Sequence, residues 1–465
     1  MNRKRRTQLV ASLGRDLVPT TLREAGPGHA KSLMVTVAGI VATVVGLLVG
    51  STVYADSHRG VADGTMGRHS ERSWVGAWSG SPQIPTPLFV APAEGFNNQT
   101  IRNIVHTSAG GNAVRLWLTN AFGTQPVTFN AIYVGIQQSG ADLVRGSNHP
   151  VTFGGNGSVT IPVGAEALSD PVPLAVESEQ NLAISLFSSG RTGRPTAHSF
   201  AQQTNYVSDP GNFAPAIGAA GFTATSTSWV FLDGIDVLTP ARIKGAVVTL
   251  GDSITDGFAS TVDANERWPD FLAPRFLSGP PGLLMSVLNE AITGNRVLND
   301  STCFGINAVA RLDRDVLTQT GVTHLIVLAG INDIGYSTAP DVFFSECFLP
   351  RPDLSPAEII TGYQQIIAQA HAMGVKVVGG TLTPFKGFFY WTEARERKRQ
   401  TINRWSKTSH AVDAVIDFAA AVAYRGDPTV LAPEHDSGDH AHVNAAGAQA
   451  MADAIDLSLF QADDG

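Results

Sequence analysis

The sequence predicts two domains in series: an antiparallel β-sandwich or jelly roll, followed by an α/β domain whose parallel sheet is covered by helices. Between residues 73 and 237 the apolar residues tend to alternate with period two, which is typical of half-buried strands. From Gly245 onward, short continuous apolar runs alternate with helical patterns, as in parallel sheets buried on both faces. A chain of 465 residues is also too long for one ordinary core.

The N-terminus has the layout of an export signal. Four basic residues at positions 3–6 precede an apolar stretch at residues 33–50, and Val53-Tyr54-Ala55 forms a small-x-small cleavage site. Cleavage before Asp56 would release the protein outside the cytoplasm, in the periplasm or as a secreted protein. The alternative is an uncleaved membrane anchor, because the stretch is nearly long enough to span a bilayer. We therefore assign residues 1–55 to a signal peptide or anchor and residues 56–72 to a linker.

Residues 73–238 form the predicted β-sandwich domain. Turn clusters such as Gly110-Gly111 separate the alternating runs, which favours antiparallel strands. A Gly, Ala and Thr-rich segment at residues 218–227 is expected to be a surface loop, and the strand at 229–237 closes the domain. The alternating runs are Val114, Leu116 and Leu118; Val159, Ile161 and Val163; and Leu182, Ile184 and Leu186.

Residues 239–465 form the predicted α/β domain. Its buried strands are expected at residues 246–250, 283–288, 324–328, 375–379 and 415–418. Helical patterns lie between or after them, at residues 307–318, 356–372, 393–410 and 445–459. In such a fold, ligands bind at the carboxyl ends of the strands.

The first expected strand of this domain runs into Gly251-Asp252-Ser253. A serine at a strand-to-helix turn has an exposed hydroxyl, and the adjacent backbone N–H is free to stabilise an oxyanion. Asp and Ser are also preferred helix caps, so the tripeptide alone does not establish catalysis.

Two further motifs follow the next strands. Gly294 allows the backbone to approach a ligand closely, which suits an N–H aimed at developing negative charge. Asn332, after the strand at 324–328, offers a side-chain amide donor at the same edge of the sheet. Taken singly, both residues could also be ordinary turn formers.

Close to the C-terminus, Asp439 stands three residues before His442. A carboxylate at this spacing can hydrogen-bond one ring nitrogen and leave the other facing a serine. His435 and His440 compete for the role, but only His442 has an acid at this spacing just before Asn444, at the start of the final helix. A solvated loop or a weak metal site is the alternative, although no further His or Cys cluster supports a metal.

Together these motifs, Gly251-Asp252-Ser253, Gly294, Gly330-x-Asn332-Asp333 and Asp439-x-x-His442, resemble the four signature blocks of SGNH (GDSL-type) hydrolases, in that chain order. The resemblance covers residues 246–455 and implies a flavodoxin-like, three-layer α/β/α fold. It implies Ser253 as nucleophile, His442 as general base and Asp439 as the acid that orients it. The N–H groups of Ser253 and Gly294 and the amide of Asn332 would form the oxyanion hole.

The N-terminal half resembles, more loosely, the β-domain that precedes the catalytic domain in some of these proteins. The similarity lies at residues 73–78 and 115–123. One departure is the segment at residues 336–353, which is longer than the core fold requires and is expected to form a lid or rim.

The implied activity is that of an exported serine esterase that works through an acyl-enzyme without metal or organic cofactor. No GxSxG surrounds a serine, which argues against an α/β-hydrolase. Acetylated carbohydrates, polysaccharides, aryl esters and lipid esters are all candidate substrates. The alternatives are an acyltransferase that uses the same serine, and a carbohydrate-binding protein with an idle hydrolase domain. A net charge of −8 argues against nucleic-acid binding.

Two features bear on the pocket and on stability. Phe388, Phe389, Tyr390 and Trp391 follow a predicted strand and are expected to line the substrate site, although they could equally pack as a loop. The chain has only two cysteines, Cys303 and Cys347, which could form a disulfide outside the cytoplasm or remain as buried thiols.

Overall fold

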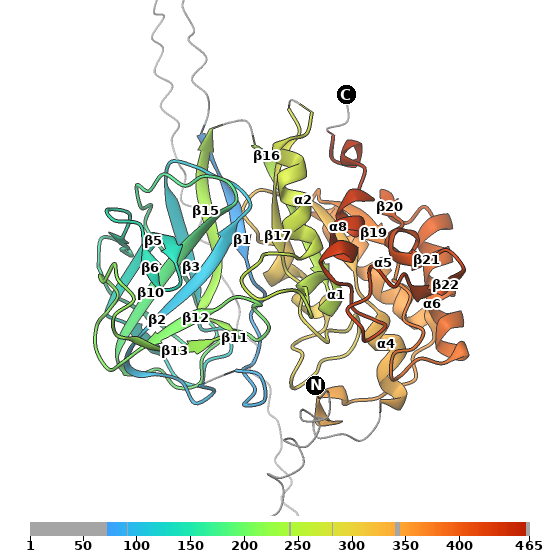
Figure 1. Ribbon diagram of the computed structural model, residues 1–465, viewed down its shortest axis with the longest axis horizontal. Helices are drawn as coiled ribbons and strands as arrows, with labels where there is room; N and C mark the ends of the chain where they lie inside the picture. The colour runs from blue at the N-terminus through green and yellow to red at the C-terminus, as the bar shows by residue number, and fades with distance from the viewer. Residues whose placement is uncertain (1–71, 91, 241–242, 281, 340–344, 462–465) are drawn as a thin grey trace, which may run out of the picture. The chain divides into compact units, whose positions relative to one another are not determined.

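The structure is a computed structural model that describes residues 72–90, 92–240, 243–280, 282–339 and 345–461 (Figure 1). These residues belong to one compact unit of the chain. The predicted signal peptide or anchor, including the apolar stretch at 33–50, lies outside the described residues. In the part of the chain that the structure describes, no helix combines the length and apolarity needed to cross a membrane.

The first half of the described chain consists of antiparallel strands. A four-stranded sheet has the order β1 (Arg72–Ser79), β15 (Leu232–Pro240), β3 (Val114–Thr119) and β9 (Glu166–Leu168). A larger sheet has the order β13 (Phe222–Ser226), β12 (Asn205–Ser208), β2 (Asn97–Thr107), β10 (Gln180–Arg191), β5 (Ala131–Ser139) and β6 (Asp142–Leu143), with β7 (His149–Pro150) also on β5. Short pairs are β4 (Val127–Phe129) with β8 (Val159–Ile161), and β11 (Ala197–His198) with β14 (Trp229–Val230).

The period-two pattern predicted these strands because alternate side chains face the core. In β3, Val114, Leu116 and Leu118 are fully buried, whereas the residues between them are partly exposed. One expectation was wrong: residues 218–227 are not all loop, because Phe222–Ser226 form strand β13 beside β12. Its Thr-rich sequence, with β-branched residues at alternate positions, suits an edge strand.

The second half contains the predicted parallel sheet. Its strand order is β17 (Leu284–Asn289), β16 (Ile243–Gly251), β18 (Val322–Leu328), β19 (Lys376–Gly380) and β20 (Ala414–Ile416). In chain order within this half, the arrangement is 2-1-3-4-5, which is the flavodoxin-like order. The strand β16 therefore lies between β17 and β18, and the segments that follow these three strands meet at one edge of the sheet.

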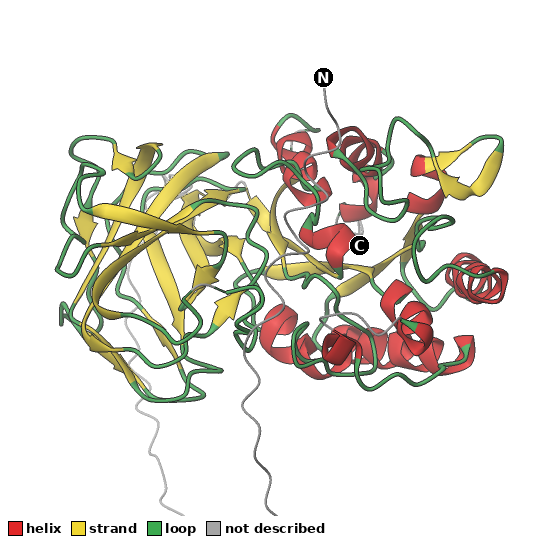
Figure 2. Ribbon diagram, turned by 60° about the horizontal axis from the view of Figure 1, so that its bottom comes forward, coloured by secondary structure: helices red, strands yellow, loops and turns green. Residues whose placement is uncertain are grey.

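Helices cover both faces of this sheet (Figure 2). On one side α2 packs against α8, and on the other α5 packs against α3 and α6. The helices are α1 (Ser253–Asp256), α2 (Trp268–Leu277), α3 (Ala308–Leu312), α4 (Ile331–Gly335), α5 (Pro356–Ala372), α6 (Glu393–Thr408), α7 (Phe418–Val422) and α8 (Ala445–Asp453). A π-helix η1 (Asp313–Leu317), 3-10 turns at Tyr336–Thr338, Ser345–Phe348 and Leu457–Phe460, and the hairpin of β21 (Ala423–Tyr424) and β22 (Asp427–Leu431) complete this half.

Helix boundaries follow local capping. Ser355 and Glu358 form a capping box at the start of α5, with Pro356 in its first turn. Asn444 caps α8 by accepting a hydrogen bond from the backbone N–H of Gly447. The predicted helix at 307–318 is present as α3 followed by η1, and its buried Arg311 and Asp315 form an ion pair of 2.8 Å.

Buried polar contacts join the antiparallel half to the α/β half. The hydroxyl of Ser81 donates to the Glu290 carboxylate at 2.6 Å and accepts from Arg311 Nη1 at 2.8 Å. Burial, with the nearby Asp315 carboxylate, raises the pKa of Glu290 to about 8. Because these groups satisfy one another away from water, they fix the two halves together at the end of β17.

Candidate active site

The geometry of the candidate site begins with the turn after β16. Asp252 is the N-cap of α1, and its carboxylate accepts the backbone N–H of Ile254 at 3.2 Å. Ser253 is therefore the first residue of a short helix that starts directly at the carboxyl end of a central strand. Its side chain lines a cavity although the residue is only 6% exposed.

The structure brings Ser253, His442 and Asp439 into one hydrogen-bonded chain. His442 Nε2 lies 2.8 Å from Ser253 Oγ, and His442 Nδ1 lies 2.6 Å from Asp439 Oδ2. When Nδ1 carries the proton and donates to the carboxylate, Nε2 is free to accept the serine proton. This arrangement has the contacts required of a nucleophile, a base and an orienting acid.

The Asp439 carboxylate is held in its ionised form. Partial burial by itself would raise its pKa. That effect is outweighed by the hydrogen bond and charge of the His442 ring and by the backbone N–H groups of His442 and Ala441, so the pKa of Asp439 lies well below its ordinary value. The acid therefore remains available to orient the imidazole.

The competing histidines lie elsewhere. His440 is about half exposed, and its Nδ1 lies 2.7 Å from Asp436 Oδ2. Neither His440 nor His435 lines the cavity that contains Ser253.

Among the residues that the structure describes, no group of three His, Cys, Asp or Glu side chains is arranged to hold a metal ion.

The three predicted amide donors border the same cavity. Among the described residues, no hydrogen-bond acceptor is assigned to the backbone N–H of Ser253 or to that of Gly294. Asn332 Nδ2 donates one hydrogen to the Asn295 carbonyl at 2.9 Å, and its amide oxygen accepts from Tyr390 at 3.3 Å. Because the amide nitrogen carries two hydrogens, one donor remains for a ligand.

Gly294 could not be replaced without moving its neighbours. Its φ angle is +78°, and a Cβ at this position would lie 2.4 Å from the Phe304 ring. The hydroxyl of Tyr336 donates to the Gly294 carbonyl at 3.0 Å, which fixes the peptide orientation. The turn therefore needs glycine for both its backbone conformation and its space.

Two buried carboxyl groups support these turns. Asp333 accepts the backbone N–H groups of Val297 and Leu298, and burial raises its pKa to about 6 despite these bonds. Burial likewise raises the pKa of Asp252 to about 7. Through these hydrogen bonds, Asp252 fixes the turn after β16 and Asp333 fixes the backbone that follows Gly294.

The cavity above Ser253 has a volume of about 400 Å³, within the range of small-molecule sites. Apart from Asp439 and His442, the residues that line it carry no formal charge. Most are aromatic: Phe89, Phe200, Phe258, Phe304, Tyr336, Phe348, Phe388, Phe389 and Tyr390.

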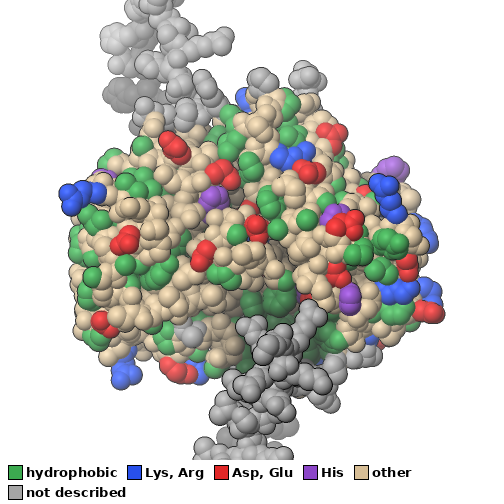
Figure 3. All heavy atoms as spheres, viewed as in Figure 1, with side chains coloured by type: hydrophobic (Ala, Val, Ile, Leu, Met, Phe, Trp, Pro, Cys, Tyr) green, Lys and Arg blue, Asp and Glu red, His purple; other side chains and the backbone are tan. Residues whose placement is uncertain are grey.

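On the face shown in Figure 3, basic and acidic side chains are interspersed, so no single-sign patch dominates that face.

Of the four aromatic residues predicted to bind substrate, three line the cavity. Phe388, Phe389 and Tyr390 do so, whereas Trp391 is not among its lining residues and has its ring 5.7 Å from Lys386 Nζ. The run forms tight turns, with Phe388 N donating to the Phe385 carbonyl and Trp391 N to the Phe388 carbonyl, so consecutive side chains point in different directions.

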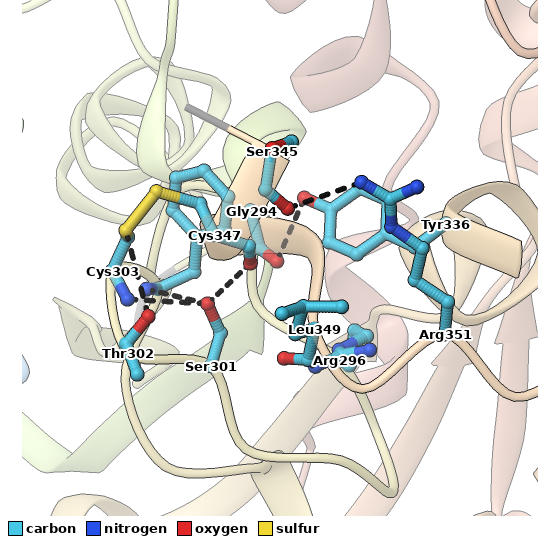
Figure 4. Close-up of a disulfide and its surroundings, with 11 residues drawn as sticks. Gly294, Arg296, Ser301, Thr302, Cys303, Tyr336, Ser345, Cys347, Leu349 and Arg351 are labelled. Atoms are coloured by element: carbon cyan, nitrogen blue, oxygen red, sulfur yellow. Dashed lines mark hydrogen bonds between the residues drawn. A yellow bond between two sulfur atoms is a disulfide. The ribbon is translucent and has the colours of Figure 1, made fainter. Parts of the chain in front are cut away.

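The disulfide between Cys303 and Cys347 is present and lies beside this cavity (Figure 4). Ser301 Oγ donates to the Cys347 carbonyl at 2.6 Å and accepts the backbone N–H of Cys303 at 3.2 Å. Each cysteine directly precedes a phenylalanine of the cavity wall, Phe304 or Phe348. The bond therefore ties residues 345–353, part of the segment expected to be a lid or rim, to the loop that covers Gly294. Residues 340–344 of that segment lie outside the described residues.

Several residues of the site were not predicted from the sequence. Phe89 and Phe200 come from the antiparallel half, and Phe258 follows α1. The buried pair of His198 and Asp256 also joins the two halves, with His198 Nε2 3.0 Å from Asp256 Oδ1. No motif or spacing in the sequence links these positions to Ser253.

Comparison with known proteins gives a family for part of the chain. Residues 249–450 match the sequence model of the GDSL-like Lipase/Acylhydrolase family, a region that contains all five residues predicted to form the triad and the amide donors. Similar solved structures include a GDSL-like lipase from Bacteroides thetaiotaomicron VPI-5482, with 17% identity, a TM-score of 0.35, and coverage of 46% of this chain and 88% of that one. A catalytic mutant of an acetylxylan esterase from Geobacillus stearothermophilus has 18% identity, a TM-score of 0.35, and coverage of 46% and 92%. A search of curated proteins finds no match.

Proposed function

Through residues 249–450 the chain belongs to the GDSL-like lipase/acylhydrolase (SGNH) family, and from this premise we propose that it is a serine hydrolase of carboxylic esters. Ser253 acts as the nucleophile, His442 as the general base and Asp439 as the acid that orients it. The Ser253 N–H, the Gly294 N–H and the Asn332 amide receive the oxyanion charge.

The reaction proceeds in two steps. Ser253 Oγ attacks the ester carbonyl while His442 Nε2 takes its proton, and the tetrahedral oxyanion faces the three amide donors. The ester C–O bond then breaks, and the imidazolium returns the proton to the leaving alcohol. Water repeats the attack on the acyl-enzyme, with His442 again as base, and releases the carboxylic acid and free Ser253.

The observation that carries this proposal is the chain of short contacts from Ser253 Oγ to His442 and on to Asp439. A capping role for Asp252 and Ser253 would explain the start of α1. It would not explain an imidazole placed on the hydroxyl by a carboxylate from a distant loop.

The experiment is hydrolysis of p-nitrophenyl acetate by the purified full chain and by its Ser253→Ala variant. We expect the variant to lose about 10³-fold or more in kcat, while its melting temperature stays near that of the wild type. Ser260→Ala, on the same segment but outside the cavity, serves as control and should retain activity. Equal activity of wild type and Ser253→Ala would remove the nucleophile assignment.

We further propose that the protein is exported, with residues 73–238 as a β-sandwich domain and residues 239–465 as the catalytic domain. The basic and apolar N-terminal sequence supports export, as does the disulfide, since such bonds persist in oxidising compartments. N-terminal sequencing of the protein secreted by an expression host should begin at Asp56. A mature chain that retains residues 33–50 in a membrane fraction would instead support the anchor.

A further inference from the structure

The geometry points to Phe89 and Phe200 as specificity-determining residues that bind a hydrophobic group of the ester substrate. Both lie outside residues 249–450, in the antiparallel half of the chain. This inference rests on the proposed function, because it names the kind of ester that the same site selects. If it holds, the antiparallel half of the chain forms part of the substrate site.

The two rings belong to a continuous aromatic wall that reaches the catalytic imidazole. Their centroids lie 4.9 Å apart. Phe200 lies 5.8 Å from Phe258, whose ring is in turn 4.7 Å from His442. On the other side, Phe89 stacks on Phe304 at 5.9 Å. A group bound against Phe89 and Phe200 is therefore within the same cavity as Ser253.

The hydroxyl hydrogens beside this wall are already engaged. The hydroxyl of Tyr336 donates to the Gly294 carbonyl, that of Tyr390 to Asn332, and that of Thr293 to Asp256. Because nine of the cavity-lining residues are aromatic, a sugar ring here would regain few of the hydrogen bonds that it makes with water. An alkyl chain or aromatic ring would instead gain by burying apolar surface against the rings.

The wall is held in place before substrate arrives. His198, two residues before Phe200, lies with its Nε2 3.0 Å from Asp256 Oδ1, and the two side chains are only 2% and 4% exposed. Asp256 Oδ2 accepts both the backbone N–H and the hydroxyl of Thr293, at 2.7 and 2.6 Å. Since Thr293 precedes Gly294, one buried network fixes both the Phe200 segment and an amide donor. A preordered wall loses little entropy on binding.

The test compares esters whose acyl or alcohol groups differ in hydrophobicity. p-Nitrophenyl octanoate and acetate vary the acyl side, while benzyl acetate and methyl tri-O-acetylxyloside vary the alcohol side. Each is assayed with the wild type, Phe200→Ala, Phe89→Ala and the control Phe213→Ala. Phe213 also belongs to the antiparallel half and is partly exposed, but it does not line the cavity.

We expect the wild type to prefer the hydrophobic member of at least one pair by about tenfold or more in kcat/KM, because each buried methylene contributes to discrimination. Phe200→Ala and Phe89→Ala should reduce that preference by about tenfold, mainly through KM. The melting temperature of both variants should stay near that of the wild type, which shows that they fold. Phe213→Ala should leave the preference unchanged.

The outcomes separate the two proposals. Hydrolysis of all esters without a hydrophobic preference, or a preference that survives both phenylalanine variants, would overturn the specificity assignment and leave the esterase intact. A higher kcat/KM for the acetylated xyloside than for benzyl acetate, with no gain from octanoate, would replace it with a sugar site. Failure to hydrolyse any of these esters would count against both proposals.

Discussion

The Nε2 atom of His442 lies 2.8 Å from the Oγ atom of Ser253, although the two residues are 189 positions apart in the chain. Ser253 is fixed by the end of β16 and the start of α1. His442 is fixed by a loop whose two sides bond to each other, Ser437 N to the His442 carbonyl and Asn444 N to the His435 carbonyl. The contact is therefore built into the fold before a substrate binds.

Replacing Asp439, the proposed orienting acid, should slow catalysis without removing the proposed nucleophile. Asp439→Asn keeps the size of the side chain, but the neutral amide no longer stabilises the imidazolium that forms during attack. We expect kcat for p-nitrophenyl acetate to fall by about 10²- to 10⁴-fold. Asp436→Asn is the matched control, because Asp436 lies on the same loop and pairs with the exposed His440. A wild-type kcat in Asp439→Asn would show that this carboxylate has no catalytic role.

Removing one amide donor should affect the transition state more than substrate binding. In Asn332→Ala, the oxyanion loses a side-chain N–H, which costs about 10²- to 10³-fold in kcat in hydrolases that use such a donor. Steady-state kinetics should show the loss in kcat with KM little changed. If KM rises while kcat is preserved, Asn332 binds the ground state and lies outside the oxyanion hole.

The stability of the protein should carry a pH dependence from Asp252. Burial raises its pKa from 3.8 to about 7, so the unfolded carboxyl ionises first and folding takes up a proton between these values. The associated stability is present below about pH 4 and is lost as the pH rises through 7. The unfolding free energy of Asp252→Asn minus that of the wild type should therefore rise by on the order of 4 kcal/mol as the pH goes from 4 to 8.

Urea unfolding of both proteins at several pH values measures this difference. A difference between wild type and Asp252→Asn that stays constant from pH 4 to 8 would mean that the carboxyl does not change its protonation in this range. The absolute stability of the variant does not enter the comparison. Only the change with pH of the difference in unfolding free energy shows whether the Asp252 carboxyl takes up a proton on folding.

The disulfide should contribute to stability through the loop that it closes. Cys303 and Cys347 are 44 residues apart, for which the loop-closure relation gives about 4 kcal/mol. We expect the double Cys303→Ser, Cys347→Ser protein to lose an amount of this order in urea unfolding. A reductant should lower the stability of the wild type in the same way and leave the double variant unaffected. Two thiols that titrate freely in unreduced native protein would contradict the bond.

The placement of the proposed triad and amide donors could be predicted because their motifs follow successive parallel strands. Ser253, Gly294 and Asn332 come after β16, β17 and β18, which are neighbours in the sheet with β16 in the middle. Since the carboxyl ends of parallel strands share one edge, chain order alone places these residues together. The spacing of Asp439 and His442 similarly allowed a local hydrogen bond to be anticipated.

The aromatic wall could not be predicted in the same way. Alternating apolar residues identify the strands of the antiparallel half, but they do not say which of its connecting segments meets the parallel sheet. Phe89 and Phe200 lie in such segments, after β1 and β11. The pair of His198 and Asp256 is likewise a contact between residues 58 positions apart, with no pattern that marks it.

The most direct test of the proposed nucleophile is the site of reaction with phenylmethylsulfonyl fluoride, an electrophile that modifies activated serines. Peptide mass mapping of the treated full chain should find one adduct, on Ser253, with loss of esterase activity in proportion to labelling. His442→Ala should label far more slowly, because its serine lacks the base. An inactivated protein whose adduct lies on another residue, or labelling of Ser253 at the same rate in His442→Ala, would contradict the assignment.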